Sequence, residues 1–383
     1  MLIAFTFLLV LLLAFANGTN DVSKSIATLV GSGVTNYGKA IIWGTLWTVG
    51  GAGLSAFVAT AMVKTFSTGF LPPQAAIQPS LALSVLSGAI AWVLFSSKTG
   101  LPVSTTHALT GSLVGTGLVA YGSENLIWSS LVTKIGLPLL LSPFLAFIAA
   151  LLFYPLVRLL ASRCEDTCLC FTPTYRALIA VDAQGMTRTL YQATGVRTPI
   201  AAVPARCERA GLNGLIIGLD SLHWISSGLT AFARGANDTP KIAAMLLLGS
   251  GVGSWSSPFM QVATFAGATI VMGLGSYFGG RRVTEVLAEK VTKMNHVEGL
   301  SANLTTSSLV LTSAALGLPV STTHLSSSAI IGIGLLQGWR AVRWRTVRDM
   351  LLAWVVTLPA SGIFAGLSYL LFERLLRAFS AGS

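Results

Sequence analysis

Long apolar stretches follow one another along the whole chain, and they constrain the fold more than any other feature of the sequence. Several exceed the ~20 residues that an α-helix needs to cross a hydrocarbon layer about 30 Å thick. The stretches cover residues 2–16, 22–34, 41–62, 80–97, 103–121, 126–157, 211–233, 236–253, 255–280, 300–316, 319–338 and 349–372. We therefore expect an all-α polytopic membrane protein. The shorter stretches come in pairs around Gly- or Pro-containing polar motifs, which is typical of broken or re-entrant helices.

The composition excludes the other protein classes. Hydrophobic residues make up 53% of the chain and charged residues only 10%, against about 25% charged in soluble domains. The mean hydropathy is +0.74. These values exclude a cytosolic enzyme, a disordered chain and a disulfide scaffold, and the unbroken apolar runs exclude a transmembrane β-barrel, whose strands alternate. No Lys or Arg precedes Lys24, so the first stretch lacks the basic start of a secretory signal and is interpreted as part of the mature protein.

The basic residues lie between the apolar stretches and not in one patch. The net charge is +11, which alone could indicate a nucleic-acid partner. Groups of Lys and Arg instead occur in residues 158–209, 281–293 and 340–348, as in the cytoplasmic loops of membrane proteins. We expect a lipid bilayer as the partner, no nucleic acid, and a multi-pass location in the cell (inner) membrane; the oligomeric state stays open.

Residues 158–210 are predicted to form a cytoplasmic linker between two transmembrane halves, 1–157 and 211–383. The segment holds seven Arg, four acidic residues and all four Cys. Ala177–Asp182 and Met186–Tyr191 flank Ala-Gln-Gly, which favours a small β-hairpin. The cysteines, whose spacing is not a strong zinc pattern, are interpreted as free thiols, and no metal is expected; they are Cys164, Cys168, Cys170 and Cys207.

The two halves are copies of each other at an offset of 217 residues. Residues 14–24 read AFANGTNDVSK and residues 231–241 read AFARGANDTPK, with seven of eleven positions identical. Residues 100–107 and 317–324 both read GLPVSTTH. Two separate motifs that keep one offset indicate a duplication.

The charges of equivalent loops predict that the copies have inverted topology. The basic loop at 281–293 corresponds to 64–76, in which only Lys64 is basic, and 340–348 corresponds to 123–131, which has no basic residue. Equivalent loops then face opposite sides of the membrane under the positive-inside rule, as in many secondary transporters. Three apolar stretches separate 158–210 from 281–293, so one of them must fail to cross if both loops are to lie on one side.

The first motif places ionisable residues within apolar stretches, where they are costly and indicate function. Its chemistry-bearing residues are Asn20, Asp21 and Lys24 in one copy and Asn237, Asp238 and Lys241 in the other. We expect Gly18 and Gly235 to break the helix, so that freed carbonyls and Asn/Asp oxygens can bind a cation. Pro240 would lie in the first turn of the following helix. The alternative is a charge-neutral structural pair in each copy.

The second motif predicts an anion site at two helix N-termini. After the Gly-Leu-Pro break, hydroxyl residues open each helix, and hydroxyls with unpaired N–H groups suit an oxyanion; they are Ser104, Thr105, Thr106, Ser321, Thr322 and Thr323. Ordinary helix capping is the alternative. His107 and His324 end the motifs and could relay a proton or play a structural role.

Asp220 and His223 form an unduplicated pair, since the equivalent residues are Ile3 and Thr6. Their i, i+3 spacing puts them on one helix face. The pair could relay a proton, and a neutral hydrogen bond between the two side chains is the alternative.

The four motifs, in this order over residues 14–338, resemble the inorganic phosphate transporter (PiT) family. The resemblance implies an anion permease with two inverted repeats and re-entrant hairpins, which carries phosphate by Na⁺ or H⁺ symport with no cofactor. It implies a cation-coupling role for Asn20, Asp21, Asn237 and Asp238, and phosphate binding by the Ser/Thr residues of the second motif. Sulfate, or another tetrahedral oxyanion, is the alternative substrate, because a branch of the family carries it.

Two departures from the family pattern make the site less negative. Family members commonly have small residues where this chain has Lys24 and Lys241, and many have a Glu where Gly299–Asn303 has no acid. Our hypothesis is that the two lysines bind phosphate and partly replace a bound cation as counter-charge. Two other readings fit less well. A hydrolase would need one nucleophile and not two intact copies, and a channel would need an open charged or carbonyl lining.

Overall fold

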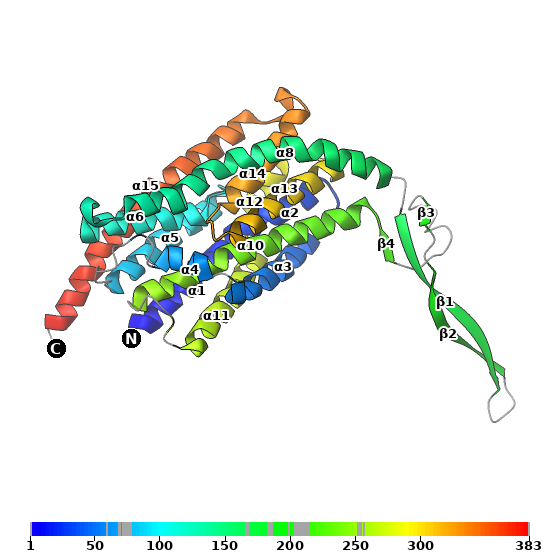
Figure 1. Cartoon of the computed structure of the whole chain (residues 1–383), viewed down its shortest axis with the longest axis horizontal. Helices are drawn as coiled ribbons and strands as arrows, with labels where there is room; N and C mark the ends of the chain where they lie inside the picture. Colours follow the sequence, from blue (N-terminus) through cyan, green and yellow to red (C-terminus); the bar gives the residue numbers. More distant parts are fainter. Residues whose placement is uncertain are drawn as a thin grey trace.

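The bundle of helices observed in the computed structural model agrees with the all-α membrane class (Figure 1). The structure describes residues 2–58, 60–67, 70, 79–164, 168–181, 187–197, 200–202, 215–250, 255 and 257–381. The first half contains α1 (Leu2–Asp21), α2 (Ser23–Gly31), α3 (Tyr37–Val58), α4 (Thr60–Ser67), α5 (Pro79–Thr99), α6 (Thr105–Tyr121), η1 (Ser123–Asn125), α7 (Trp128–Ser130), η2 (Leu131–Gly136) and α8 (Leu137–Cys164). The second half contains α10 (Leu219–Ser250), α11 (Pro258–Phe278), α12 (Arg281–Glu289), α13 (His296–Ala315), α14 (Thr322–Leu336), η3 (Trp339–Ala341) and α15 (Trp344–Ala381).

Among the described residues, six helical segments are long and apolar enough to cross a membrane. They are Leu2–Gly31, Tyr37–Val58, Ser80–Thr99, Trp128–Ala161, Pro258–Phe278 and Trp344–Ala378. Large apolar side chains such as Phe57, Phe259 and Val355 point outward. In a bilayer this outer surface faces lipid tails, which are as apolar as the side chains themselves.

The predicted helix breaks at the hairpin motifs are present. α5 ends before Gly100 and α13 ends before Gly317, and both glycines have the left-handed backbone (φ +81° and +68°) that other residues rarely adopt. α6 and α14, which follow the breaks, have only 17 and 15 residues. Each is shorter than the ~20 residues of a full crossing, so α5–α6 and α13–α14 form hairpins that turn inside the bundle.

The predicted breaks at Gly18 and Gly235 are wrong. Gly18 lies inside α1, and Gly235 and Pro240 both lie inside α10, so Pro240 is not in a first turn. The glycines allow close helix packing instead. A Cβ on Gly235 would lie 2.8 Å from the backbone nitrogen of Ala52 in α3, and one on Gly18 would lie 2.7 Å from that of Ser276 in α11.

The continuity of α10 also changes the number of helices between the linker and the next basic loop. The stretches predicted at 211–233 and 236–253 belong largely to this one helix, so only α10 and α11 separate the linker from the basic loop at 281–293. If α10 crosses once, as the candidate span α11 does, both basic segments lie on one side, as the positive-inside rule requires. α10 is not among the six candidate spans, so this sidedness stays a prediction.

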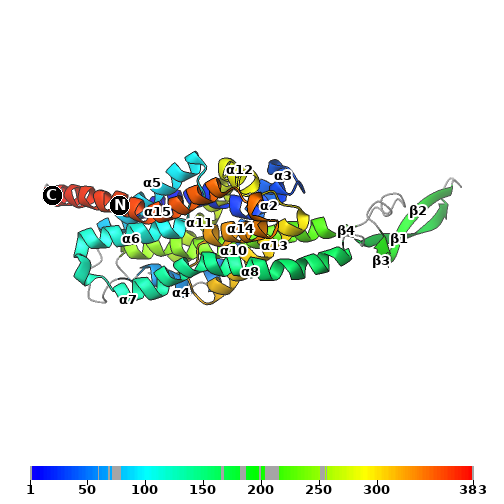
Figure 2. The ribbon, with the colours of Figure 1, turned by 90° about the horizontal axis from the view of Figure 1, so that it is seen from above.

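Helices of the two halves exchange partners throughout the bundle (Figures 1 and 2). α3 packs on α10 while its counterpart α11 packs on α1, and α6 packs on α15 while α14 packs on α8. Each half therefore completes the packing of the other.

The linker carries a small antiparallel sheet that projects from one end of the bundle (Figure 1). Its strands are β1 (Cys168–Val181), β2 (Thr187–Arg197), β3 (Ile200–Ala202) and β4 (Leu215–Ile217). The β1–β2 ladder pairs Ala177 with Tyr191, within the segment in which the sequence predicts a hairpin; the turn residues and Cys207 lie outside the described residues.

The linker is displaced along the chain relative to the predicted 158–210 segment. Residues 158–164 continue α8, in which Arg158 is exposed, and α10 begins only at Leu219. The apolar Leu215–Ile217 segment pairs with β1 instead of starting the next helix.

Candidate functional site

Two buried ion pairs lie at the centre of the bundle. Lys24 contacts the carboxylate of Asp21, and the Lys241 ammonium lies 3.2 Å from the Asp238 carboxylate. The i, i+3 spacing puts each pair on one face of its helix, and no side chain of the four is more than 4% exposed. Charges buried in this way require mutual pairing and further hydrogen bonds to offset their lost hydration.

The asparagines of the first motif connect each ion pair to the second motif, GLPVSTTH, of the same half. Asn20 donates to the carbonyl of Val103 at 2.7 Å, and Asn237 donates to that of Val320 at 3.2 Å. The lysine ammonium groups donate to the same carbonyls at 3.3 and 3.0 Å. Equivalent residues thus make equivalent bonds in both halves, at the offset of 217 residues.

Two threonines cross from one half to the other with the same symmetry. Thr106 donates to the carbonyl of Val320, and its counterpart Thr323 donates to the carbonyl of Val103, at 3.4 and 2.7 Å. Exchanging the halves converts one bond into the other, which is the pattern of a two-fold relation. The two hairpins therefore meet at the charged centre.

The hairpin serines act as helix caps. Ser104 accepts a hydrogen bond from the His107 backbone N–H at 3.1 Å, and Ser321 accepts one from that of His324 at 3.2 Å. Capping uses an acceptor lone pair, so each hydroxyl keeps its O–H donor. The first helical residues follow directly, and their N–H groups carry the positive end of the helix dipole toward the centre.

Asn17, which sequence reasoning missed, joins the two carboxylates. Its side-chain nitrogen lies 3.3 Å from a carboxylate oxygen of Asp21, 3.3 Å from one of Asp238 and 3.0 Å from the Thr105 hydroxyl. Thr322 donates to the same Asp21 oxygen at 3.3 Å. The signal for Asn17 was its place in the duplicated motif, three residues before Asn20.

Arg234, also missed, takes the position equivalent to Asn17 in the second half. Its guanidinium is buried and bonds Thr48 at 2.5 Å and Ser276 at 3.1 Å through one nitrogen. The other two nitrogens have no hydrogen-bond partner among the described residues. With Lys24 and Lys241 it makes three cationic groups against two carboxylates, so the centre has one positive charge in excess.

The same centre offers oxygen ligands. The side-chain oxygens of Asn17, Asn20 and Asn237 are buried without a hydrogen-bond partner in the described part of the chain. Hard cations such as Na⁺ are bound by carboxylate and amide oxygens. In this structure, however, an ammonium group already lies against each carboxylate.

The histidines predicted as proton relays lie in two separate places. The rings of His107 and His324 contact each other between the two hairpins, with centroids 4.3 Å apart, and His324 also contacts Trp354. Asp220 bonds His296 at 2.6 Å. His223 is buried, and neither ring nitrogen has a partner among the described residues. The alternative of a hydrogen bond between Asp220 and His223 is therefore wrong.

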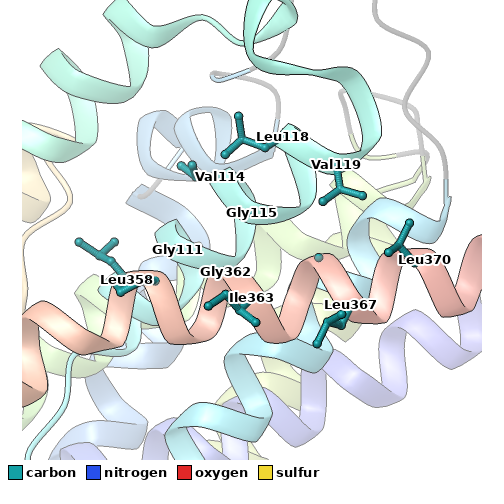
Figure 3. Close-up of a pocket in the computed structure, with 12 residues that line it drawn as sticks. Gly111, Val114, Gly115, Leu118, Val119, Leu358, Gly362, Ile363, Leu367 and Leu370 are labelled. Atoms are coloured by element: carbon teal, nitrogen blue, oxygen red, sulfur yellow. The ribbon is translucent and has the colours of Figure 1, made fainter.

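An apolar groove of about 640 Å³ lies between α6 and α15 (Figure 3). Glycines and aliphatic side chains such as Leu118 and Leu370 line it. It offers an anion no donor side chain, so the charged centre, and not this groove, is the candidate site.

Comparisons with known proteins agree with these observations. The family model described as the phosphate transporter family matches residues 17–365. A protein of Rhizobium meliloti named "probable low-affinity inorganic phosphate transporter" is 30% identical over 93% of this chain and 92% of its own. One of Bacillus subtilis with the same name is 28% identical over 94% of each chain.

A solved structure titled "the sodium-dependent phosphate transporter" has the same fold. Its TM-score is 0.75 at 21% identity, and the match covers 97% of this chain and 99% of that one. The match of the family model over most of the chain shows the family. The chain belongs to the phosphate transporter family, whose members are transporters and not enzymes.

Proposed function

We propose that this protein carries inorganic phosphate across the cell (inner) membrane by cation symport. The observation that carries the proposal is the excess positive charge at the centre, in contact with threonine hydroxyls at the N-termini of two helices, where first-turn N–H groups are further donors. An oxyanion would neutralise this charge and accept from those donors. The broken hairpins of two inverted copies suit alternating access around a fixed central site.

The phosphate ligands would come from both halves. We assign them to the hydroxyls of the second motif, the two lysines and the guanidinium, which are Ser104, Thr105, Thr106, Ser321, Thr322, Thr323, Lys24, Lys241 and Arg234. Guanidinium binds phosphate through paired donors, and Arg234 has donors to spare. One excess positive charge matches dihydrogen phosphate better than doubly charged sulfate.

We propose H⁺ as the coupling ion, bound by the Asp21 and Asp238 carboxylates with Asn20 and Asn237 beside them. The lysine ammonium groups lie where a metal cation would meet those carboxylates, which supports the hypothesis that they partly replace it. Na⁺ is the second candidate, since three amide oxygens at the centre have no partner among the described residues.

Uptake of radiolabelled phosphate into proteoliposomes tests the proposal. We expect accumulation driven by an inward proton gradient, competition by arsenate and little competition by sulfate. If sulfate competes and phosphate does not, the substrate is sulfate. Accumulation driven only by a sodium gradient would replace H⁺ by Na⁺.

Counterflow separates a transporter from a channel. Unlabelled phosphate loaded inside the proteoliposomes should accelerate uptake of labelled phosphate, because a carrier can return to the outward-facing state with phosphate bound. A unitary current that does not saturate with phosphate would contradict the proposal.

A further inference from the structure

Polar residues form a column in the second half, from the linker end of α10 to the charged centre. At the end of the column, Asp220 lies in the first turn of α10, directly after the linker strand β4, and is paired with the partly exposed His296 of α13. One turn deeper lies the buried His223. We call these residues and the deeper ones on α2, α10 and α13 the polar column; its deeper members are Ser25, Thr28, Ser227, Thr230 and Asn303.

His223 and Thr28 face each other across a glycine. A Cβ on Gly299 of α13 would lie 2.7 Å from the His223 Nε2 and 3.3 Å from the Thr28 Cβ, so both side chains border the space that a larger residue would fill. Both His223 nitrogens and the Thr28 hydroxyl are buried without a partner among the described residues. An unpaired buried polar group is costly, and here the side chains that carry such groups border one space.

The column continues to the central ion pair along α2. Thr28 follows Lys24 by four residues, so the two share one face of the helix, and Lys24 contacts the Asp21 carboxylate. Beside this route Ser227 of α10 donates to the carbonyl of Ser25 at 2.7 Å. Polar side chains therefore recur on α2 between the His223 side, at Thr28, and the ion pair, at Lys24.

The first half has an apolar core at the equivalent place. At an offset of 217 residues, His223, Ser227, Thr230, Asn303 and Thr28 correspond to Thr6, Val10, Leu13, Leu86 and Met245. The four aliphatic residues are fully buried in one hydrophobic cluster, and the Thr6 hydroxyl donates to the carbonyl of Leu2. The fold thus accommodates an apolar core here, and the polar column is a property of one side of the molecule only.

We propose that the polar column conducts the coupling proton between the linker side and Asp21, with His223 as the relay. This inference rests on the proposed proton symport. His223 accepts a proton on one ring nitrogen from the Asp220–His296 side and releases one from the other toward Thr28; rotation of the ring restores its starting form. The Thr28 hydroxyl accepts this proton as it gives up its own, and a proton ends on the Asp21 carboxylate while Lys24 keeps its three. Lys24 then loses its counter-charge and its ammonium is available to the phosphate anion, which couples the two bindings.

The groups around His223 suit this direction of transfer. Its own helix contributes Asp220, α13 contributes His296 and Glu298, and α2 contributes Lys24 one turn beyond Thr28. On α3, the indole of Trp43 contacts Trp224, the residue that follows His223. The Asp220–His296 pair lies toward the linker end and the Lys24–Asp21 pair lies toward the centre, so His223 lies between two charged pairs.

Proton flux and phosphate exchange, measured on the full chain in proteoliposomes, test the proposal. In His223→Gln, we expect phosphate-coupled proton flux, followed with an internal pH dye, to fall about a hundredfold, the usual scale for loss of a proton-transfer group. Exchange of labelled for unlabelled phosphate at equal pH needs no net proton movement and should be unchanged. Thr6→Val, at the equivalent position of the first half, is the control and should change neither.

The possible outcomes distinguish failure of the proton-conduction proposal from failure of the proposed function. Normal proton flux in His223→Gln overturns the proposal, and so does loss of exchange together with flux in the folded variant, since that indicates a structural role. If His223→Gln does not fold, His296→Gln at the exposed end must slow proton flux with exchange intact, and normal flux there overturns the proposal. Absence of phosphate exchange in the unmodified protein would instead contradict the proposed function.

Discussion

One position of the duplicated motif holds Asn17 in the first half and Arg234 in the second, and this difference sets the charge of the centre. Asn17 uses its amide to join two carboxylates, whereas Arg234 brings a guanidinium with two unpartnered nitrogens in the described structure. A symmetric pair of asparagines would leave the two aspartates balanced by the two lysines. The difference therefore places one guanidinium, a group that binds anions, in only one of the two copies.

Arg234→Asn, which restores the residue of the first half, should weaken phosphate binding. A hydrogen bond to a charged group contributes about 1.5–3 kcal/mol, so we expect the KM for uptake to rise about ten- to a hundredfold. Arg234→Lys should recover part of the loss, because it keeps the charge without the paired donors. Arg348→Asn removes an exposed arginine and should leave the KM unchanged. An unaltered KM in Arg234→Asn would remove this residue from the site.

The combined change Lys24→Ala with Lys241→Ala should alter the ion dependence of uptake. It removes both ammonium groups from the carboxylates and leaves two negative charges with amide oxygens beside them, which is the ligand set of a hard cation. We expect uptake to become dependent on added Na⁺, as measured across a series of sodium concentrations at constant pH. If uptake and its ion dependence are both unchanged, the lysines do not act as counter-charges.

Asp238→Asn should abolish phosphate accumulation while the protein still inserts into the membrane. Asparagine keeps the shape and can still bond Asn237, but it loses the charge that pairs with Lys241 at 3.2 Å. Accumulation of labelled phosphate and the amount of protein in the membrane fraction are the two measurements. Asp349→Asn, at an exposed ion pair, is the control. Normal accumulation would reduce the Asn-Asp pairs to structural elements.

Residue chemistry was predictable where the motif itself carried charge and unpredictable where it depended on distant partners. Asp21 and Asp238 were identified because acids inside apolar stretches are costly. Arg234 was missed because the first copy of the motif has a neutral asparagine at this position, so the duplication did not mark it. The partner of Asp220 is His296, 76 residues away, and no local spacing indicates a contact of that kind.

At the scale of helices, glycine explains both the success and the failure of the sequence predictions. Gly100 and Gly317 end helices because they adopt positive φ before a Leu-Pro pair. Gly235 looks similar in the sequence, yet it serves the close crossing of α10 and α3. A glycine's role depends on the neighbouring helix, which the local sequence does not contain.

Gly235→Ala should destabilise the protein through this crossing. The added Cβ would lie 2.8 Å from the Ala52 backbone nitrogen, and backbone can move only with its helix, so we expect a loss of about 1–3 kcal/mol, the usual cost of overpacking. The thermal midpoint in detergent measures it. The control is Gly53→Ala in α3, next to Ala52. A Cβ there meets no atom within 4 Å, so the variant should be neutral or slightly stabilising. Equal thermal midpoints for the two variants would contradict the close packing of α10 on α3 at Gly235.

At the scale of the whole molecule, the transport bundle and the linker sheet are separable. The β1–β2 hairpin projects away from the helices (Figures 1 and 2), and the predicted site residues all lie on helices or hairpin turns of the bundle. Replacing residues 168–202 with a flexible Gly/Ser segment of about 20 residues, which spans roughly 25 Å, should leave phosphate uptake intact. Loss of uptake in a correctly inserted variant would show that the sheet takes part in transport.

The exchanged threonine bonds also have a consequence for how the protein is made. The Val103 carbonyl is completed by Thr323, which the ribosome adds 220 residues later. Asp21 and Lys24 are synthesised long before that partner exists. The surface of α6 that packs on α15 is likewise uncovered until α15 is made. The polar residues of the nascent first half therefore lack their partners, and water, lipid headgroups or the insertion machinery must solvate them until translation ends.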